Sequence, residues 1–218
     1  MTPRINPFVI SGYVSSEYFC DREAESAQLI REVCNGNNVA LLSTRRMGKS
    51  GLIQHCFQKP ELRDDYYTFF IDIYPTKSLR EFVFALSKNI LESLKPRGKR
   101  ALETFLKCIH SLQAGISFDV AGNPSFNVQL GDIQHTETTL DEIFKYLTAA
   151  DKPCIVAIDE FQQIAEFKDS KTFQKRLRSV WQLQKSVFYC LFGSKKHLMN
   201  ELFEKKSLPF YKFGDAIY

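Results

Sequence analysis

One segment constrains the fold more than any other: residues 39–50, with the sequence VALLSTRRMGKS. Its first four residues form a short apolar strand pattern, and the residues that follow the segment indicate a helix. The loop between them fits the phosphate-binding pattern G-x-x-x-x-G-K-[ST], except that Ser43 replaces the first glycine. In such a loop, backbone N–H groups and the N-terminus of the following helix attract an anion. The segment therefore predicts a phosphate site at a strand–loop–helix junction.

Two residues of this loop have specific expected roles. Lys49 would reach the β- and γ-phosphates, and the hydroxyl of Ser50 would bind Mg²⁺. The other loop positions would surround the phosphates: Ser43, Thr44, Arg45, Arg46, Met47, Gly48 and Gly51. Arg45 and Arg46 could instead contact a neighbouring subunit or form a solvated basic loop. Because the first glycine is missing, a chance strand–turn–helix is the alternative interpretation of the whole segment.

The second informative segment comprises residues 154–160, CIVAIDE, an apolar run that ends in two acids. This is the pattern of a buried Walker B strand. Asp159 would hold the Mg²⁺ ion, and Glu160 would orient or deprotonate an attacking water. The two segments in this order predict a site for a nucleoside triphosphate with Mg²⁺. The guanine-reading motif Asn-Lys-x-Asp does not occur in the sequence, so we expect ATP.

The composition limits the class of protein. With 218 residues, of which 44% are hydrophobic and 25% charged, the chain can form one folded α/β domain. No apolar run is long enough to span a membrane. The six cysteines lack C-x-x-C spacing, so we expect a cytoplasmic, reduced protein, and the four scattered histidines do not indicate a metal site. The net charge of +4 permits nucleic-acid binding without proving it.

Apolar strand patterns alternate with helical patterns along the chain. Besides the two strands above, residues 66–73 and 186–192 are expected to form strands. This alternation predicts a parallel sheet sandwiched by helices, with ligands at the carboxyl ends of the strands. Three of those ends are followed by polar residues that we expect to converge: Ser43, Asp159 and Ser194. Asp72, at the end of another strand, is either a further Mg²⁺ contact or a cap.

Several features outside the sheet can also be predicted. Residues 1–20 indicate an extended N-terminal arm, and residues 113–135 contain the alternating pattern of an inserted β-hairpin. The expected helix starts are an N-cap at Asp21 and two capping boxes, Ser78 to Glu81 and Thr139 to Glu142. A basic stripe on the helix after Glu160 is interpreted first as a solvated face, and otherwise as an arginine finger or nucleic-acid contact: Lys171, Lys175 and Arg178.

With these motifs, the chain resembles the archaeal-type, AAA+-like ATPases of the STAND group within the P-loop NTPases. The resemblance extends over nearly all of residues 1–218 and rests on six short motifs: NPF at 6–8, YFCDRE at 18–23, RRMGKS at 45–50, DEFQ at 159–162, FGS at 192–194 and PFY at 209–211. It implies a P-loop NTPase fold with ATP and Mg²⁺ as cofactors. It also implies that Ser194 is a polar sensor on a strand between the P-loop and Walker B strands, where it would act beside Lys49 and Glu160. Phe19, Asp21 and Arg22 would lie near the adenine.

The chain departs from this family in two further places. Leu208 stands where relatives often have an arginine, which argues against a charge-sensing arginine there. The sequence ends at Tyr218, about where a fifth core strand would begin, and relatives commonly continue into a winged-helix or similar C-terminal domain. We therefore expect that this C-terminal domain is absent and that the P-loop strand lies at an exposed edge of the sheet.

Three functions are consistent with the sequence. The first is an Mg²⁺-dependent ATPase module that relays its nucleotide state to a partner protein, a second copy of the chain or a missing domain. The second is a nucleotide-binding switch or scaffold that hydrolyses little ATP, which the serine at position 43 favours. The third is a nucleic-acid-associated motor or regulator. No membrane partner is expected.

Overall fold

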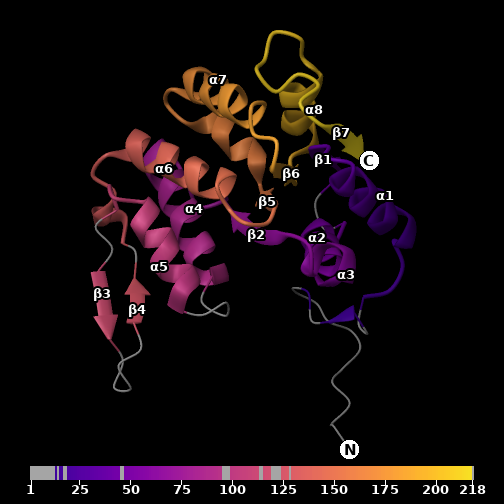
Figure 1. The fold of residues 1–218 in the computed structure, drawn as a ribbon. Helices are drawn as coiled ribbons and strands as arrows, with labels where there is room; N and C mark the ends of the chain where they lie inside the picture. Colours follow the sequence, from indigo (N-terminus) through magenta and orange to yellow (C-terminus); the bar gives the residue numbers. More distant parts are fainter. Residues whose placement is uncertain are drawn as a thin grey trace, which may run out of the picture.

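The computed structural model describes residues 13, 15–16, 19–44, 47–94, 99–112, 115–118, 124–127 and 129–217. A five-stranded sheet forms its centre, in the order β2-β5-β6-β1-β7, and all of its strand pairs are parallel. The strands are β1 (Val39–Leu42), β2 (Tyr67–Asp72), β5 (Cys154–Asp159), β6 (Val187–Gly193) and β7 (Asp215–Ile217). Helices surround this sheet (Figure 1), which confirms the predicted α/β fold.

The two faces of the sheet bury different sets of apolar side chains. Alternate residues of a strand point to opposite faces, so Ala40 and Leu42 of β1 contact one helical layer, and Val39 and Leu41 contact the other. The first layer contains α4 (Leu79–Leu94), α5 (Lys99–Cys108), α6 (Thr136–Thr148), α7 (Ser170–Trp181) and α8 (Lys196–Glu204). The second contains α1 (Glu23–Cys34), α2 (Lys49–Gln58) and the short α3 (Pro60–Arg63). Because both faces are covered, β1 and β5 are continuous apolar runs, as parallel strands typically are.

Smaller elements complete the described chain. The antiparallel strands β3 (Gly115–Phe118) and β4 (Pro124–Asn127) form the predicted hairpin between α5 and α6. Two 3₁₀ helices, η3 (Leu130–Asp132) and η4 (Phe161–Glu166), precede α6 and α7. Most of the predicted N-terminal arm lies outside the described residues. Within the part of the chain that is described, no helix has the length and apolar character needed to cross a membrane.

The strand β7 corrects the prediction that the P-loop strand lies at an exposed edge. It pairs with β1 from Val39 to Leu41, so β1 is an internal strand between β6 and β7. Gly214 makes this pairing possible, because a side-chain carbon there would lie 2.6 Å from the carbonyl oxygen of Asn38. The amide of Asp215 donates a hydrogen bond to that same oxygen. The prediction was wrong because a strand of three residues is too short to produce a recognisable pattern.

One of the two predicted capping boxes is also wrong. Thr139 lies inside α6, which begins three residues earlier, and its hydroxyl donates to a backbone carbonyl of the preceding turn. The carboxylate of Glu142 instead accepts hydrogen bonds from the amide and hydroxyl of Ser111, just after α5. The Glu142 carboxylate, which the capping-box pattern assigned to the start of the helix, is therefore used in a tertiary contact. At the other box, the amide of Glu81 donates to the Ser78 hydroxyl at 3.3 Å, as expected.

Candidate functional site

The loop between β1 and α2 turns at a glycine. Gly48 has a φ of 67° directly before α2, a conformation that residues with side chains rarely adopt. Its carbonyl oxygen accepts the amide of Leu52, so the first turn of α2 starts at the loop. Met47 is exposed beside it, whereas Arg45 and Arg46 lie outside the described residues. The first amides of α2 lack partners within the helix, as at any helix start, and they point toward the loop where an anion would bind.

The side chain of Lys49, the first residue of α2, turns back over the loop. It is only 7% exposed, and its Nζ donates to the carbonyl oxygens of Thr44 at 2.7 Å and Ser43 at 3.2 Å. Burial lowers the pKa of Lys49, and the opposing attraction of Asp159 and Glu160 does not reverse this direction. The ammonium group is thus held inside the loop by two carbonyl oxygens that phosphate oxygens could replace.

Ser43 fits the position of the missing glycine without backbone strain. It is not among the described residues with positive φ, so a residue with a side chain is tolerated there. Its Oγ is buried and has no hydrogen-bond partner among the described residues. A buried hydroxyl without a partner costs about 1–3 kcal/mol. This orphaned group fits a loop that receives a ligand with hydrogen-bonding oxygens.

Ser50 and Asp159 meet although they are 109 residues apart in sequence. The Ser50 hydroxyl donates to Oδ2 of Asp159 at 2.6 Å. Both groups are oxygen ligands of the kind that Mg²⁺ prefers. Burial raises the pKa of Asp159, and the neighbouring carboxylates of Glu160 and Asp72 act in the same direction. Asp72 is the partner of Asp159 across the β2–β5 pair, but its carboxylate accepts the amide of Tyr74 at 2.8 Å, which is a capping role.

Glu160 and Ser194 are in direct contact at the ends of neighbouring strands. Oε2 of Glu160 accepts hydrogen bonds from the Ser194 hydroxyl at 2.9 Å, from the Ser194 amide at 3.4 Å and from the side-chain amide of Gln162. Ser194 directly follows β6, which lies between β1 and β5 as the family resemblance implied. Glu160 itself has a φ of 56°, uncommon for a residue other than glycine. The local backbone and three donors therefore fix the position of this carboxylate.

Gln162 belongs to the site although its sequence pattern assigned it no role. Its side chain is fully buried, with Nε2 directed at Glu160. Its Oε1 lies against Gly193, where an added side-chain carbon would be only 1.7 Å from this oxygen. The two residues occur in the motifs DEFQ and FGS, but nothing in either motif reveals that they touch. Gln162 therefore positions Glu160, and Gly193 leaves the space for it.

The segment before α1 contacts the P-loop helix through Phe19. The Phe19 ring stacks on His55 of α2 with 4.1 Å between ring centroids, and the ring of Tyr13 meets both at an edge. Phe19 also lies beside Gly51: a side-chain carbon added at Gly51 would be in van der Waals contact with the Phe19 ring, at 3.9 Å. An aromatic side chain from the N-terminal segment is thus held next to the first turn of α2.

Arg22 connects the same segment to the P-loop itself. Its Nη1 donates to the carbonyl oxygen of Met47 at 2.6 Å, and its Nε bonds Glu25 at 3.1 Å. Asp21 is exposed, and its carboxylate accepts the Arg22 amide instead of capping α1, which corrects the predicted N-cap. Both residues have positive φ, so the chain turns sharply before the helix begins. Of this pair, Arg22 bonds the loop, whereas no hydrogen bond joins Asp21 to the described residues of the loop.

The fold is shared with solved structures of archaeal proteins. A Walker-type ATPase of Pyrococcus abyssi is similar over 97% of this chain and 57% of its own, with 18% identity and a TM-score of 0.62. The ORC1 protein of Aeropyrum pernix, solved in complex with DNA, matches 91% of this chain and 45% of its own, with 11% identity and a TM-score of 0.56. The ORC2 protein of Aeropyrum pernix, solved as ADPNP-ADP complexes, matches 94% and 49%, with 16% identity and a TM-score of 0.53.

These comparisons establish the fold. At such identities the similarity shows a shared fold alone, and the chain spans about half the length of the structures it matches. No protein-family model matches the sequence, and neither does any curated protein.

Proposed function

We propose that the chain is an Mg²⁺-dependent ATPase module. The observation that carries this proposal is the 2.6 Å contact between Ser50 and Asp159, because it joins the phosphate loop to the acidic end of β5. Lys49 and the loop amides would hold the β- and γ-phosphates, and Ser50 and Asp159 would hold Mg²⁺. When bound, Mg²⁺ would neutralise charge on the phosphate oxygens. The similarity to a Walker-type ATPase and to a protein solved with ADPNP and ADP supports this assignment.

In this proposal Glu160 is the general base. Its carboxylate would accept a proton from the water that attacks the terminal phosphate of ATP, which yields ADP and phosphate. Ser194 and Gln162 hold one oxygen of this carboxylate and would set its direction. Because any change in their contacts would move Glu160, Ser194 is well placed as the sensor. The nucleotide state would then be relayed to a partner protein, a second copy or a further domain.

The N-terminal segment would contribute to the adenine site. Phe19 offers an aromatic face beside the start of α2, and Arg22 holds the backbone of the P-loop. Asp21, which is exposed and has no hydrogen bond to the described part of the loop, would contribute only if nucleotide binding rearranges this turn. We also propose, on the six sequence motifs, that the chain belongs to the STAND group. None of the six cysteines forms a disulfide bond in the described part of the chain, which supports a cytoplasmic location.

The first test is calorimetric titration of ATP with Mg²⁺ against the chain and two lysine variants. Lys49→Ala should abolish binding, because it removes the cation inside the loop. Lys59→Ala, at the other end of α2, removes the same charge outside the site and should bind as the unmodified chain does. Equal binding by all three proteins, or no binding by any of them, would contradict the proposal.

The role of Glu160 is tested separately by steady-state phosphate release. Glu160→Gln keeps the size of the side chain but cannot accept a proton, so turnover should fall by about 10²–10⁴-fold. ATP binding should be retained, since Glu160 is not proposed to hold the phosphates. The matched control is Glu166→Gln, at the end of η4. The carboxylate of Glu166 pairs with Lys195 at the surface, so this variant should keep full activity. Unchanged turnover in Glu160→Gln would remove Glu160 from the mechanism.

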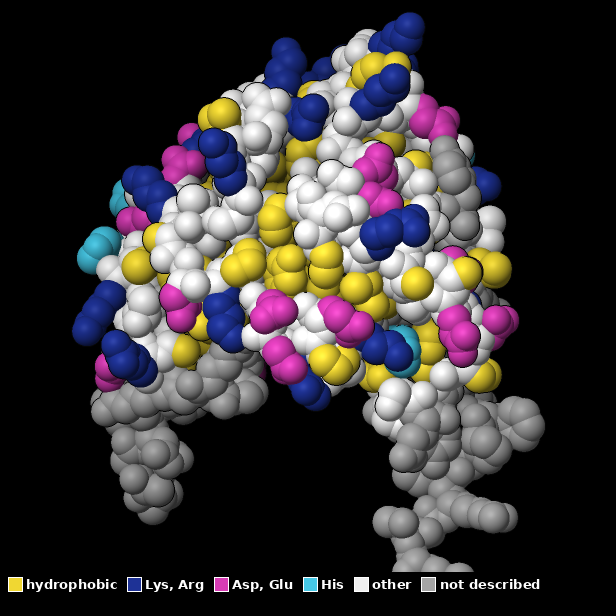
Figure 2. Space-filling view, turned by 45° about the vertical axis from the view of Figure 1, so that its right-hand side comes forward, with side chains coloured by type: hydrophobic (Ala, Val, Ile, Leu, Met, Phe, Trp, Pro, Cys, Tyr) yellow, Lys and Arg dark blue, Asp and Glu magenta, His cyan; other side chains and the backbone are white. Residues whose placement is uncertain are grey.

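Nucleic-acid binding is the second candidate function. Basic side chains gather at the upper end of the face in Figure 2, the end where Figure 1 places α7 and α8. Lys171 and Lys175 of α7 are exposed, whereas Arg178 stacks over the ring of Phe213 at 4.6 Å. Arg178 is therefore a packing residue, which corrects the prediction that it belongs to the solvated basic stripe with Lys171 and Lys175.

Binding of a labelled duplex DNA at several salt concentrations tests this second function. Contacts to phosphates predict a steep loss of affinity as salt rises. Replacing Lys171 and Lys175 together by Gln should weaken binding and reduce that salt dependence. The absence of binding at low salt would exclude the function for this chain.

A further inference from the structure

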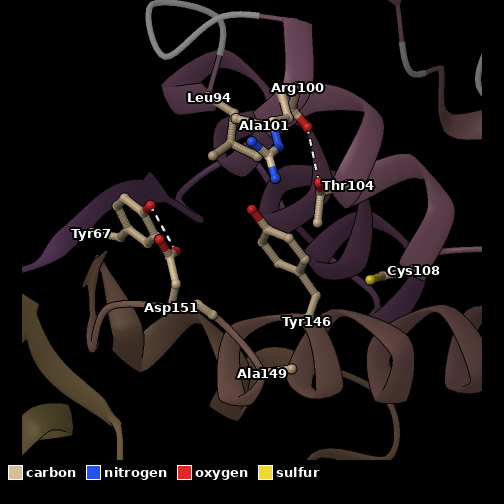
Figure 3. Close-up of a pocket in the computed structure, with 10 residues that line it drawn as sticks. Tyr67, Leu94, Arg100, Ala101, Thr104, Cys108, Tyr146, Ala149 and Asp151 are labelled. Carbon is tan, nitrogen blue, oxygen red and sulfur yellow. Dashed lines mark hydrogen bonds between the residues drawn. The ribbon is translucent and has the colours of Figure 1, made fainter.

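A pocket lies at the end of the sheet opposite to the P-loop. Its volume is about 530 Å³, within the range of roughly 300–1,000 Å³ that is usual for small-molecule sites. Tyr67 begins β2 and Asp151 precedes β5, so the pocket adjoins the amino ends of two strands. Its other walls come from α5 and from the ends of α4 and α6 (Figure 3). None of the described residues assigned to the nucleotide site lines it.

Arg100 gives one wall of this pocket a positive charge. Its guanidinium points into the pocket, on the side that the Tyr146 hydroxyl also faces (Figure 3). No salt bridge involves Arg100 in the described part of the chain. A guanidinium without a carboxylate partner is suited to a carboxylate or phosphate, which it binds through two parallel hydrogen bonds. This wall is therefore a place for an anionic group.

The opposite wall carries a negative charge. The carboxylate of Asp151 accepts a hydrogen bond from the Tyr67 hydroxyl at 2.8 Å, which holds the tyrosine ring in the wall. Between the two charges the lining is mainly apolar, with Leu94 and Ala101 beside Arg100. A ligand with anionic groups at both ends would place one of them against Asp151, which disfavours its binding. The pocket thus disfavours a second anionic group, and its mainly apolar lining suits a molecule with a single anionic end and an apolar body.

We propose that this pocket binds a small organic anion with an apolar body, whose carboxylate or phosphate group pairs with Arg100. The site is separate from the proposed nucleotide site and does not depend on it. Its lining includes Tyr67, the first residue of β2, and Asp151, in the loop before β5. The far ends of these two strands carry Asp72 and Asp159 of the proposed nucleotide site.

The probe is 1-anilinonaphthalene-8-sulfonate, which combines an aromatic body with one anionic group and fluoresces in apolar surroundings. Titration of the full chain should show saturable binding at one site. Benzoate and phenyl phosphate should then displace the probe, and the stronger competitor identifies the anionic group that Arg100 prefers. A fluorescence increase without saturation, or no displacement by either anion, would overturn the proposal.

A matched pair of charge variants places the probe at Arg100. Arg100→Gln should weaken probe binding by about tenfold, the effect expected when a charge-assisted hydrogen bond is lost. Lys145→Gln removes the same charge from the exposed side of α6, next to Tyr146 in sequence, and should bind like the unmodified chain. Lys49→Ala should also leave probe binding unchanged. Equal weakening in Arg100→Gln and Lys145→Gln, or none in either, would overturn the proposal, provided that equal melting temperatures show both to be folded.

Cys108 gives a second readout, because it lines the pocket. In a chain with the exposed Cys20 and Cys34 replaced by Ser, alkylation by iodoacetamide reports mainly on this thiol. The preferred competitor should slow alkylation of Cys108 several-fold at saturation. An unchanged rate with the competitor bound would place it elsewhere and would overturn the proposal even if the probe binds.

Discussion

At the scale of residues, the carboxylate of Asp159 links stability to pH. Burial raises its pKa and outweighs the hydrogen bonds from Ser50 and the Glu160 amide, which lower it. The folded chain therefore binds this proton more tightly than the unfolded chain does. Protonated Asp159 stabilises the folded chain at low pH, and this contribution is lost as the pH rises through the raised pKa. At neutral pH the ionised Asp159 therefore opposes folding. A bound Mg²⁺ ion would remove that opposition.

The variant Asp159→Asn tests this sign. Without added nucleotide, it should melt at a higher temperature than the unmodified chain at about pH 8, because it cannot ionise. The difference should shrink as the pH falls, because Asp159 then takes up its proton and no longer opposes folding. Thermal unfolding followed by circular dichroism at several pH values measures it. A lower melting temperature for Asp159→Asn at about pH 8 would contradict the prediction.

The second prediction at the scale of residues concerns Gly193. In Gly193→Ala the new carbon would lie 1.7 Å from Oε1 of Gln162, so the glutamine must move and the core must shift. We expect a loss of about 1–3 kcal/mol in the free energy of unfolding, together with slower ATP turnover, since Glu160 loses a positioning donor. Gly131→Ala is the control, because no atom lies within 4 Å of its added carbon. Equal stability of the two variants in denaturant titrations would show that Gln162 is not confined as described.

The residues of the site differ in how far the sequence could predict them. Ser43 and Ser194 follow apolar strands, and Asp159 ends one. The rule that parallel strands end at one edge was enough to predict that these strand ends are neighbours. Their chemical roles remain predictions. Gln162 could not be assigned, because its position depends on a contact with Gly193 that joins two separate motifs. Local patterns report which face a residue occupies, but not which side chain it will meet.

At the scale of elements, the pairing of β7 with β1 depends on Gly214. Gly214→Ala would place a carbon 2.6 Å from the Asn38 carbonyl oxygen and displace the start of β7. We expect faster hydrogen exchange of the β1 amides and a loss of about 1–3 kcal/mol in unfolding free energy. Exchange measured by mass spectrometry on peptides that contain Val39 to Leu42 tests this, again with Gly131→Ala as the control. Unchanged hydrogen exchange of the β1 amides would mean that pairing with β7 contributes little to the protection of β1.

Long helices and strands were easier to predict from the sequence than short ones. The long apolar strands β5 and β6 and the helix α4 were expected from periodicity, because many residues repeat the same signal. The three-residue β7 carried no such repetition. The capping box at Thr139 failed for another reason: its Glu142 bonds Ser111, a partner that is remote in sequence. Leu208, where an arginine was expected, packs against the core of the α4 layer.

At the scale of the whole molecule, nucleotide binding should be visible as stability. A ligand at about 100 times its dissociation constant adds about 2.7 kcal/mol to the free energy of unfolding. For a domain of this size, this corresponds to a rise of roughly 5–10 °C in melting temperature. Differential scanning fluorimetry with ATP and Mg²⁺ should show this rise for the unmodified chain and none for Lys49→Ala. A similar rise in both proteins would mean that ATP binds outside the P-loop.

The strand order also sets the timing of folding during synthesis. β1 is made early, yet its strand partners among the described residues are β6 and β7, which begin about 145 and 175 residues later in the chain. At about 5–20 residues per second, the ribosome needs roughly 10–30 seconds to supply those partners. Throughout that interval the apolar strand that leads into the P-loop has no sheet to join. The nascent chain is therefore most exposed to aggregation or chaperone capture at the strand that its proposed catalytic function needs most.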